Sequence, residues 1–509
     1  MNRIATGPRP ASRPGTDAAP SCTMVLFGAA GDLAKRLLIP SLYNLAEGGL
    51  LADDFRLVGV DAADLDEDAW KTSLRQTVDG FMRDPDAEFH PERIDDAAWE
   101  RLMDRASLVR ADFTDSRAFD GLREAVGKGS VLFYLAVPAH FFAGIAEGLG
   151  RAGLFAEVDG TFRRLVVEKP FGSDLSSARE LNTRLLTVAR EDQIFRIDHF
   201  MGKEPVQSIL AMRFGNRMFE PLLSAEHVER VEITAAETLG VEGRAKFYEP
   251  TGALRDMVPN HLFQLLCMIA MDPPSSLDPE AVRLEKTRLL RAVRPVAQMD
   301  VVFGQYGAGQ IGGTAVPAYR DEPGVAPDSE TETYVALTLH VENWRWSGTP
   351  FLLATGKRMS QKRTQIVLRF RPPPSRLFDE APGAAVDVPD TSDRITLTVD
   401  PVEGIEIAFD VKQPGPGMKL APIVSRFRFD EAFAESPNVG YEVLLYDAML
   451  GDATLFQRAD TIEAAWAVVD PVLTGERPTL RAYAAGTDGP EPVSASPVRP
   501  RGDRAWARG

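Results

Sequence analysis

The sequence predicts an α/β domain with a parallel sheet, followed by an α+β domain with a large, mainly antiparallel sheet. Its 509 residues exceed the roughly 250–300 residues at which a single hydrophobic core stops growing. In the first half, short apolar runs alternate with helical patterns, which is typical of βαβ units. In the second half, several segments alternate apolar and polar residues, as antiparallel strands with one buried face do.

We place the domain boundary near residue 200, which gives domains at 22–200 and 201–486. The flanking segments 1–21 and 487–509 are rich in Pro, Gly and Arg, which predicts disordered tails. The few acids of the first segment also suit a transit peptide, but its proline density argues against the amphipathic helix that such a peptide forms.

Unbroken apolar runs in the first half predict strands that helices cover on both faces. They are Thr23–Phe27, Phe55–Val60, Val131–Val137, Leu165–Glu168 and Ile194–Ile197. Period-two segments in the second half predict strands at Val228–Glu237, Tyr334–Trp346, Gln365–Phe370, Ile395–Val399 and Ile405–Val411. Helical spacing predicts helices at Asp174–Arg190, with Ser173 or Asp174 as N-cap, and at Leu254–Met271 and Asn438–Ala448.

Composition excludes several classes of function. The chain has 57 Lys+Arg against 74 Asp+Glu, a formal charge of −17, so it lacks the broad positive field that attracts nucleic acid or an anionic membrane. No apolar stretch approaches the roughly 20 residues that span a bilayer. Cys22 and Cys267 are the only cysteines and lie far apart in the sequence. This excludes a disulfide framework and a CxxC metal site, and it indicates a reducing, cytoplasmic compartment.

A glycine-containing loop follows the first predicted strand and leads into a helical pattern. The loop reads Gly28-Ala29-Ala30-Gly31-Asp32-Leu33-Ala34, a G-x-x-G-x-x-A variant of the dinucleotide fingerprint. Gly28 permits the tight turn, Gly31 lets backbone amides approach a pyrophosphate, and Ala34 packs the helix against the sheet. The helix N-terminus attracts phosphate, and Lys35 and Arg36 add charge. The loop predicts a Rossmann-type dinucleotide-binding domain, with a purely structural turn as the alternative.

The end of the second predicted strand bears on the choice of nicotinamide cofactor. An acidic residue there accepts a hydrogen bond from the ribose 2′-hydroxyl of NAD, whereas the 2′-phosphate of NADP favours a nearby arginine. The strand runs into Asp61, the next arginine along the chain is Arg75, and acids crowd the intervening loop. These residues favour NAD. The alternative is a solvated acidic loop without a ligand role.

Three further segments are rich in polar residues. Glu168-Lys169-Pro170 ends a predicted parallel strand, where open α/β sheets bind ligands, although a surface turn would also explain it. Arg196–Glu204, which reads RIDHFMGKE, follows another strand. Leu254–His261, which reads LRDMVPNH, enters an apolar helix, where a single histidine would more often belong to the core. The chain has only six histidines, however, and two of them lie in these polar segments.

Together these segments resemble the glucose-6-phosphate dehydrogenase family. GAAGDLAKR is similar to the GASGDLAKR loop of that family, and RIDHFMGKE to its RIDHYLGKE signature, which is the most specific match. EKPFG, GVEGRAKFYEPTGALRD, GALRDMVPNH and TGKRMSQKRTQIVLRF extend the resemblance from about Thr23 to about Tyr483. The resemblance implies oxidation of glucose 6-phosphate at C1 to the lactone with hydride transfer to NAD or NADP, the first step of the oxidative pentose phosphate pathway. It also implies a homodimer or homotetramer and a reaction without a metal.

The resemblance further implies roles for individual residues. His261 is then the general base, Asp198 the carboxylate that holds its imidazole, and Lys169 a contact to both sugar and cofactor. The phosphate ligands would be His199, Lys203, Lys357 and Lys362, while Glu237 and Asp256 would accept hydrogen bonds from sugar hydroxyls. The cofactor would lie against Gly28, Ala29, Ala30, Gly31, Asp32, Leu33, Lys35 and Asp61.

Three residues depart from the family pattern. Ala30 replaces a small hydroxyl residue of the loop and removes a phosphate contact. Ala62 stands where NADP-using relatives have an arginine, so NAD or dual use is expected despite the common NADP preference of the family. Lys362 stands where many relatives carry arginine, which replaces a bidentate fork with a point charge.

Two alternative functions stay open. One is a sugar dehydrogenase of the glucose–fructose oxidoreductase type, which does not explain RIDHFMGKE, Lys357 and Lys362. The other is a non-catalytic homologue, which predicts the loss of His261 or Asp198, and both are present.

Overall fold

The computed structural model describes residues 17–83, 89, 91, 93–113, 115, 118–158, 160–375, 393–432 and 439–491. Most of both predicted tails, at 1–16 and 492–509, lies outside the described residues. The chain forms two compact units. The first comprises Met1–Glu204, Pro274–Leu284 and Ala434–Glu463, and the second Pro205–Pro273, Glu285–Phe433 and Ala464–Gly509. None of the helices in the described ranges combines the length and apolar character needed to cross a bilayer.

A six-stranded parallel sheet forms the centre of the first unit. Its strands are β1 (Thr23–Phe27), β2 (Arg56–Asp61), β3 (Ala106–Arg110), β4 (Val131–Leu135), β5 (Arg163–Val167) and β6 (Ile194–Arg196). They lie in the order β3-β2-β1-β4-β5-β6, and the neighbours are parallel. This order is that of a doubly wound dinucleotide-binding fold, so the predicted α/β class is confirmed. The sequence pattern does not predict β3, because this edge strand is mostly half-buried and forms no apolar run.

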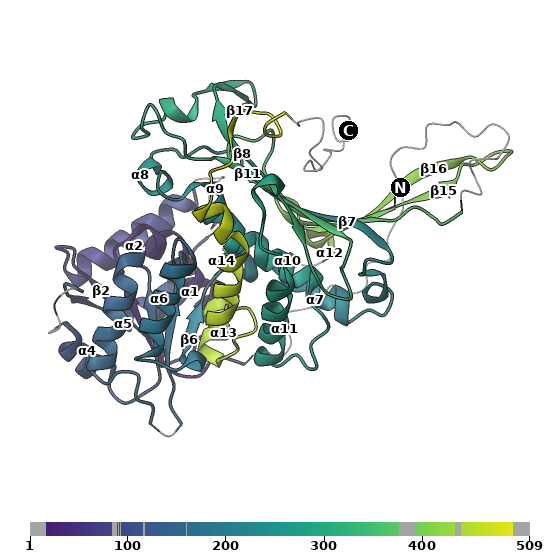
Figure 1. The fold of residues 1–509 in the computed structure, drawn as a ribbon. Coiled ribbons are helices and arrows are strands. Elements are labelled where there is room, and N and C mark those ends of the chain that lie inside the picture. Colours follow the sequence, from purple (N-terminus) through teal and green to yellow (C-terminus); the bar gives the residue numbers. More distant parts are fainter. Residues whose placement is uncertain are drawn as a thin grey trace. The chain divides into compact units, whose positions relative to one another are not determined.

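Helices accompany this sheet, and Figure 1 shows α2, α4, α5 and α6 flanking it. The helices are α1 (Ile39–Glu47), α2 (Glu67–Phe81), α3 (Asp96–Asp104), α4 (Ala118–Val126), α5 (Phe142–Arg151), α6 (Leu175–Leu186) and α13 (Glu442–Leu450). Asp174, one of the two residues predicted as N-cap, caps α6 by accepting a hydrogen bond from the amide of Ser177. The helix ends at Leu186, earlier than predicted, and the hydroxyl of Thr187 donates to the carbonyl of Arg184, a local bond that competes with helix continuation.

A nine-stranded mixed sheet forms the centre of the second unit. Its strands are β7 (Val228–Ala236), β8 (Val301–Gly307), β11 (Tyr334–His340), β12 (Pro350–Gly356), β13 (Arg363–Phe370), β14 (Arg394–Asp400), β15 (Gly404–Lys412), β16 (Leu420–Arg428) and β17 (Leu480–Ala484). The order is β16-β15-β14-β13-β7-β12-β11-β8-β17. The pairs β7–β12 and β8–β17 are parallel and the other neighbours antiparallel, which confirms the predicted class. A small hairpin pairs β9 (Gly309–Ile311) with β10 (Thr314–Val316).

The predicted strand Tyr334–Trp346 is too long, because β11 ends at His340. Asn343 then forms a tight turn: its side chain accepts from the amide of Trp346, and its carbonyl from the amide of Ser347. A local side-chain bond of this kind offers the backbone an alternative to the sheet ladder. The remaining helices are α7 (Glu204–Phe214), α8 (Ala245–Tyr248), α9 (Gly252–Met257), α10 (Phe263–Ala270), α11 (Pro279–Ala292), α12 (Phe429–Ala432) and α14 (Ala459–Thr474).

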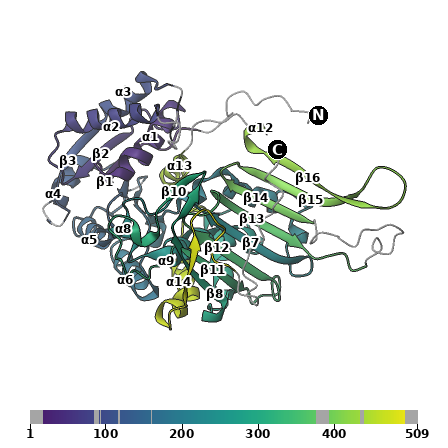
Figure 2. The ribbon, with the colours of Figure 1, turned by 90° about the horizontal axis from the view of Figure 1, so that it is seen from above.

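Strands β15 and β16 form a two-stranded arm at one edge of the second sheet, and Figure 2 shows them extending beyond the neighbouring strands. Phe409 faces Ile423 across the two strands, and Phe427 faces Ile405. Phe409, Ile423 and Phe427 are exposed by 40%, 40% and 49%. The arm therefore presents apolar side chains outside the core.

Candidate active site

The glycine loop has the backbone geometry that the fingerprint predicts. Gly28 follows β1 with a φ of +83°, and a Cβ at this position would lie 2.3 Å from the carbonyl oxygen of Ala136. Only glycine fits there, because the site combines a left-handed backbone with a close backbone neighbour. The indole of Trp70, on α2, donates to the carbonyl of Ala29 at 3.0 Å and fixes the loop from outside. The chain then turns into a π-helical segment, Ala34–Leu38, that continues as α1.

Asp61, at the end of β2, links this loop to the acidic turn that follows. Its Oδ2 accepts from the amide of Ala30 at 2.9 Å, and its Oδ1 from the amide of Ala63 at 2.9 Å. The carboxylate thus braces both segments of the chain. The loop leads into the N-terminus of a helical segment, and such an N-terminus fits the pyrophosphate of a dinucleotide.

Glu168, the residue before Lys169, lies at the carboxyl end of β5 and is buried with two tyrosines. The hydroxyl of Tyr134, on β4, donates to Glu168, and Tyr441 also hydrogen-bonds to it. Burial raises the pKa of the Glu168 carboxyl to about 7, against the lowering effect of both tyrosines. The sequence pattern singled out Lys169 and missed this network, because its partners lie on other elements.

The raised pKa gives a prediction for stability. The native state binds a proton at Glu168 that the unfolded chain, with its ordinary value near 4.5, releases at a lower pH. This carboxyl therefore lowers the free energy of unfolding as pH rises from about 4.5 to about 7, by on the order of 3 kcal/mol. We expect Glu168→Gln to show a smaller fall in Tm between about pH 5 and about pH 8 than the parent chain. The control is Glu100→Gln, exposed on α3. Equal falls in Glu168→Gln and the parent would contradict the assignment.

A short 3₁₀ turn, His199–Gly202, follows β6 after two residues, with Asp198 as its N-cap and Lys203 as its C-cap. Asp198 is buried and accepts from the amide of Phe200 at 3.0 Å, so the carboxylate fixes the turn. The ring of His199 stacks on that of Tyr441, with centroids 6.4 Å apart and planes 15° apart. The Lys203 ammonium lies 5.8 Å from the ring centre of Phe200. Tyr441 therefore contacts both the 168–169 strand end and this cationic turn.

His261 lies in a π-helical turn, Val258–Leu262, that interrupts the predicted helix Leu254–Met271. Pro259 is the physical reason, since it has no amide to donate to the carbonyl four residues earlier. The side-chain amide of Asn260 donates to the carbonyl of Arg255 at 3.2 Å in its place. Such π turns occur often at functional sites. The sequence predicts a continuous helix here, and Pro259 was the signal that could have revealed the interruption.

Glu237 and Lys357 come together in the second unit. The Lys357 ammonium pairs with the Glu237 carboxylate, and it lies 5.2 Å from the ring centre of Tyr248. Their backbones are joined as well, because the amide of Glu237 donates to Gly356 and that of Met359 to Glu237.

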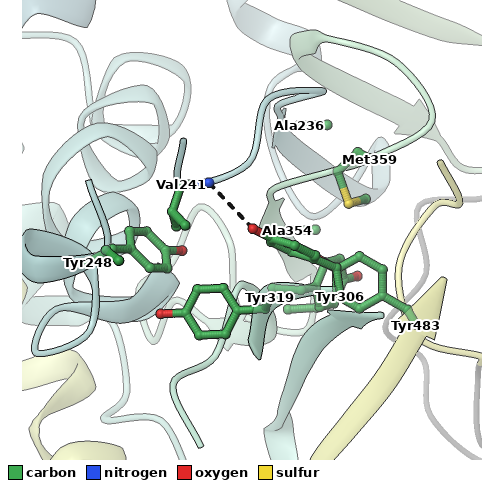
Figure 3. Packing of buried hydrophobic residues seen from close by; sticks show 11 residues of the cluster. Ala236, Val241, Tyr248, Tyr306, Tyr319, Ala354, Met359 and Tyr483 are labelled. Carbon is green, nitrogen blue, oxygen red and sulfur yellow. Dashed lines mark hydrogen bonds between the residues drawn. The ribbon is translucent and has the colours of Figure 1, made fainter. Parts of the chain in front are cut away.

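A buried cluster that includes Tyr248 and Tyr483 lies next to Lys357, and Figure 3 shows its members. The hydroxyl of Tyr483 donates to the carbonyl of Lys357 at 2.6 Å. That of Tyr306 donates to Glu322 and accepts from the amide of Val241. The cluster thereby fixes the backbone at Lys357 and at Val241, which follows Glu237 along the chain. The sequence pattern does not reveal this cluster.

The remaining predicted residues lie on other elements. Asp256 is half-buried on α9, in the helical stretch that leads to His261. Lys362 precedes β13 and is exposed, and its ammonium pairs with the Asp400 carboxylate at 2.9 Å. Lys35 is half-buried after the glycine loop, and Arg36 pairs loosely with Asp32 at 3.7 Å.

Among the described residues, the predicted site consists of two groups, one in each unit. The first unit brings the glycine loop, Asp61, Lys169 and Asp198 to the carboxyl ends of β1, β2, β5 and β6, where doubly wound sheets bind ligands. The second unit joins Glu237 to Lys357 and holds His261 in a fixed turn. This combination defines a dinucleotide-binding α/β protein with a second domain built on a large mixed sheet.

Comparisons with known proteins define the family. Residues 25–208 match the model described as "Glucose-6-phosphate dehydrogenase, NAD binding domain", and 210–507 match "Glucose-6-phosphate dehydrogenase, C-terminal domain". The chain is 40% identical over 502 residues to glucose-6-phosphate 1-dehydrogenase of Mycolicibacterium smegmatis, covering 96% of this chain and 98% of that protein. It is 38% identical to the enzyme of that name from Zymomonas mobilis, covering 93% and 96%.

Solved structures agree with these matches. The crystal structure of glucose-6-phosphate 1-dehydrogenase from Mycobacterium avium has a TM-score of 0.79 at 35% identity, covering 93% of this chain and 96% of that one. A glucose-6-phosphate dehydrogenase in complex with glucose 6-phosphate has a TM-score of 0.83 at 30% identity, covering 94% and 97%. The chain belongs to the glucose-6-phosphate dehydrogenase family.

Proposed function

We propose that the chain oxidises glucose 6-phosphate at C1 to 6-phosphogluconolactone and passes the hydride to NAD or NADP, the first step of the oxidative pentose phosphate pathway. The observation that carries this proposal is the polar turn Asp198–Lys203 after β6. It lies at the carboxyl end of the parallel sheet, where β1 leads into the glycine loop and β5 leads to Lys169. Relatives that match nearly the whole chain bear the name glucose-6-phosphate 1-dehydrogenase, which supports it.

The chemistry requires a base and a hydride acceptor. His261 accepts the proton of the C1 hydroxyl as the C1–H bond breaks, and Asp198 is assigned to stabilise the imidazolium. The nicotinamide, when bound, takes up the hydride with its electron pair, which leaves a carbonyl at C1. The π turn that Pro259 and Asn260 maintain supports His261 in a defined position.

Cationic side chains are assigned to the substrate phosphate. His199 and Lys203 share one short turn, and Lys357 and Lys362 come from the large-sheet unit. Charge-assisted hydrogen bonds of this kind are the strong ones for a dianion. Glu237 and Asp256 are assigned to sugar hydroxyls, and Lys169 to the sugar and the cofactor. A sugar dehydrogenase of the glucose–fructose oxidoreductase type offers no explanation for the matches in both domains.

Initial rates of nicotinamide reduction test this function. We expect reduction of NAD, NADP or both with glucose 6-phosphate, and a far lower kcat/KM with unphosphorylated glucose. Equal use of glucose would remove the phosphate assignment, and no reduction of either nucleotide would contradict the proposal as a whole.

Cofactor preference follows from the end of β2. We infer that Asp61 favours NAD through the ribose 2′-hydroxyl and that Ala62 removes the arginine expected for an NADP-specific enzyme. The bonds of Asp61 to the amides of Ala30 and Ala63 give it a bracing role beside that ligand role. NAD or dual use is the outcome we propose.

The apolar arm supports a homodimer or homotetramer. Two-stranded ribbons are marginally stable alone, and β16 is an edge strand with apolar side chains in solvent. We expect Ile423→Lys to shift the chain towards monomer in size-exclusion chromatography with light scattering. Met299→Lys, at a residue 89% exposed elsewhere in the second unit, serves as the control. A parent chain that is monomeric at micromolar concentration would refute the assignment.

We further propose a cytoplasmic location, which two free and buried cysteines support. The first domain is assigned to the dinucleotide, and the second to the substrate and to self-association.

A further inference from the structure

Arg110, which is far from Asp61 in the sequence, lies beside it in the sheet and thus beside the proposed ribose site. Arg110 is the last residue of β3, and in the parallel ladder it pairs in register with Asp61, the last residue of β2. The amide of Ala111 donates to the carbonyl of Asp61 at 2.9 Å, so the ladder continues past both strand ends. Residues paired in register on neighbouring strands project to the same face of a sheet. The Arg110 side chain therefore starts beside that of Asp61.

Arg110 is held by the acidic turn after β2. Its Nη1 lies 2.5 Å from Oδ1 of Asp64, and the two side chains are exposed by 62% and 88%. Ion pairs this exposed contribute little to stability. The pair therefore keeps the guanidinium at the turn without sequestering it, and a stronger anion can displace Asp64.

We propose that Arg110 binds the 2′-phosphate of NADP and thereby allows dual cofactor use without an arginine after β2. This inference rests on the proposed dinucleotide function. The 2′-oxygen of the ribose is assigned to the end of β2, and β3 is the next strand outward from the glycine loop. A phosphate on that oxygen carries more charge than a carboxylate and accepts a bidentate bond from a guanidinium.

Asp64 then acts as the competing anion that limits NADP affinity. It neutralises Arg110 when no phosphate is bound, and Asp61 stands next to the same position. Glu67 also lies beside β3, since its Oε2 accepts from the amide of Leu108 at 3.3 Å, but its charge is compensated by Lys71, whose ammonium lies 2.8 Å from the other oxygen. The nearby carboxylates of Asp61 and Asp64 weaken the binding of a dianionic 2′-phosphate but not that of the uncharged 2′-hydroxyl of NAD. The chain thus binds both cofactors, with NAD favoured.

The test is the equilibrium binding of NADPH and NADH, followed by nucleotide fluorescence in the absence of sugar. We expect Arg110→Ala to raise the Kd of NADPH about 10- to 100-fold, the effect of one charge-assisted bond, and that of NADH less than about twofold. Asp64→Asn lowers the Kd of NADPH alone. Ala62→Arg, which restores the missing arginine, lowers it too. The charge-matched control is Arg151→Ala, exposed at the end of α5.

The outcomes separate this inference from the proposed function. Unchanged NADH binding by Arg110→Ala shows that the variant is folded, so a selective loss of NADPH supports the assignment. If Arg110→Ala changes the Kd of both nucleotides equally, or changes neither, the assignment of Arg110 is wrong, whereas the proposed dinucleotide site is unaffected. If the parent chain bound neither nucleotide, both this inference and the proposed dinucleotide function would fail.

Discussion

His261→Asn is expected to lower kcat with glucose 6-phosphate by on the order of 10²–10⁴, the contribution of a positioned general base. Asparagine keeps the size and polarity of the side chain but cannot accept and hold a proton. KM should change less than about threefold, because the interaction lost is made in the transition state rather than on binding. Initial rates over a range of sugar concentrations separate the two parameters.

A control histidine makes this result specific. His340, half-buried at the end of β11, belongs to the same unit and has no assigned role, so His340→Asn should leave kcat unchanged. Because His261 is buried, the Tm of His261→Asn must also be measured, to show that the turn is intact. A parent-like kcat in a folded His261→Asn would remove it as the base.

Lys203→Ala is expected to weaken glucose 6-phosphate by about 1.5–3 kcal/mol, the range for a hydrogen bond to a charged group. This corresponds to a rise in KM of about 10- to 150-fold. The slow activity on unphosphorylated glucose should not change, since that sugar offers no phosphate to Lys203. Lys128→Ala, an exposed lysine of the first unit, is the matched control.

Inorganic phosphate, used as an inhibitor of the reaction, probes the phosphate site independently of the sugar. Inorganic phosphate should compete with glucose 6-phosphate in the parent chain and compete less well in Lys203→Ala. A variant whose KM and phosphate inhibition both equal those of the parent would place the substrate phosphate elsewhere.

Much of the fold can be predicted from local sequence patterns. The sequence predicts the strand Thr23–Phe27 with the bounds that the structure has, and it predicts Ser173 or Asp174 as the N-cap of α6, of which Asp174 is the cap. Burial on both faces and capping leave strong local signatures. The edge strand β3 was missed because its burial is partial. Strands β8, β12, β16 and β17 were missed too, and the parallel pairing of β7 with β12 depends on contacts far apart in the sequence.

The site divides in the same way. Segments such as Gly28–Ala34 could be found because their function requires fixed residue types within one short stretch. The Glu168–Tyr441 contact and the Asp61–Arg110 register could not, since the sheet order and helix packing bring distant residues together. Along the chain after β2 the first arginine is Arg75, whereas the neighbouring strand supplies Arg110.

Transfer of deuterium from C1 tests the central claim most directly. Glucose 6-phosphate labelled with deuterium at C1 is incubated with the chain and NAD or NADP, and the reduced nucleotide is analysed by mass spectrometry. The account predicts one deuterium on the nicotinamide for each lactone formed, since the C1–H bond is the one that breaks. Reduced nucleotide without deuterium, with the label retained in the sugar, would contradict it.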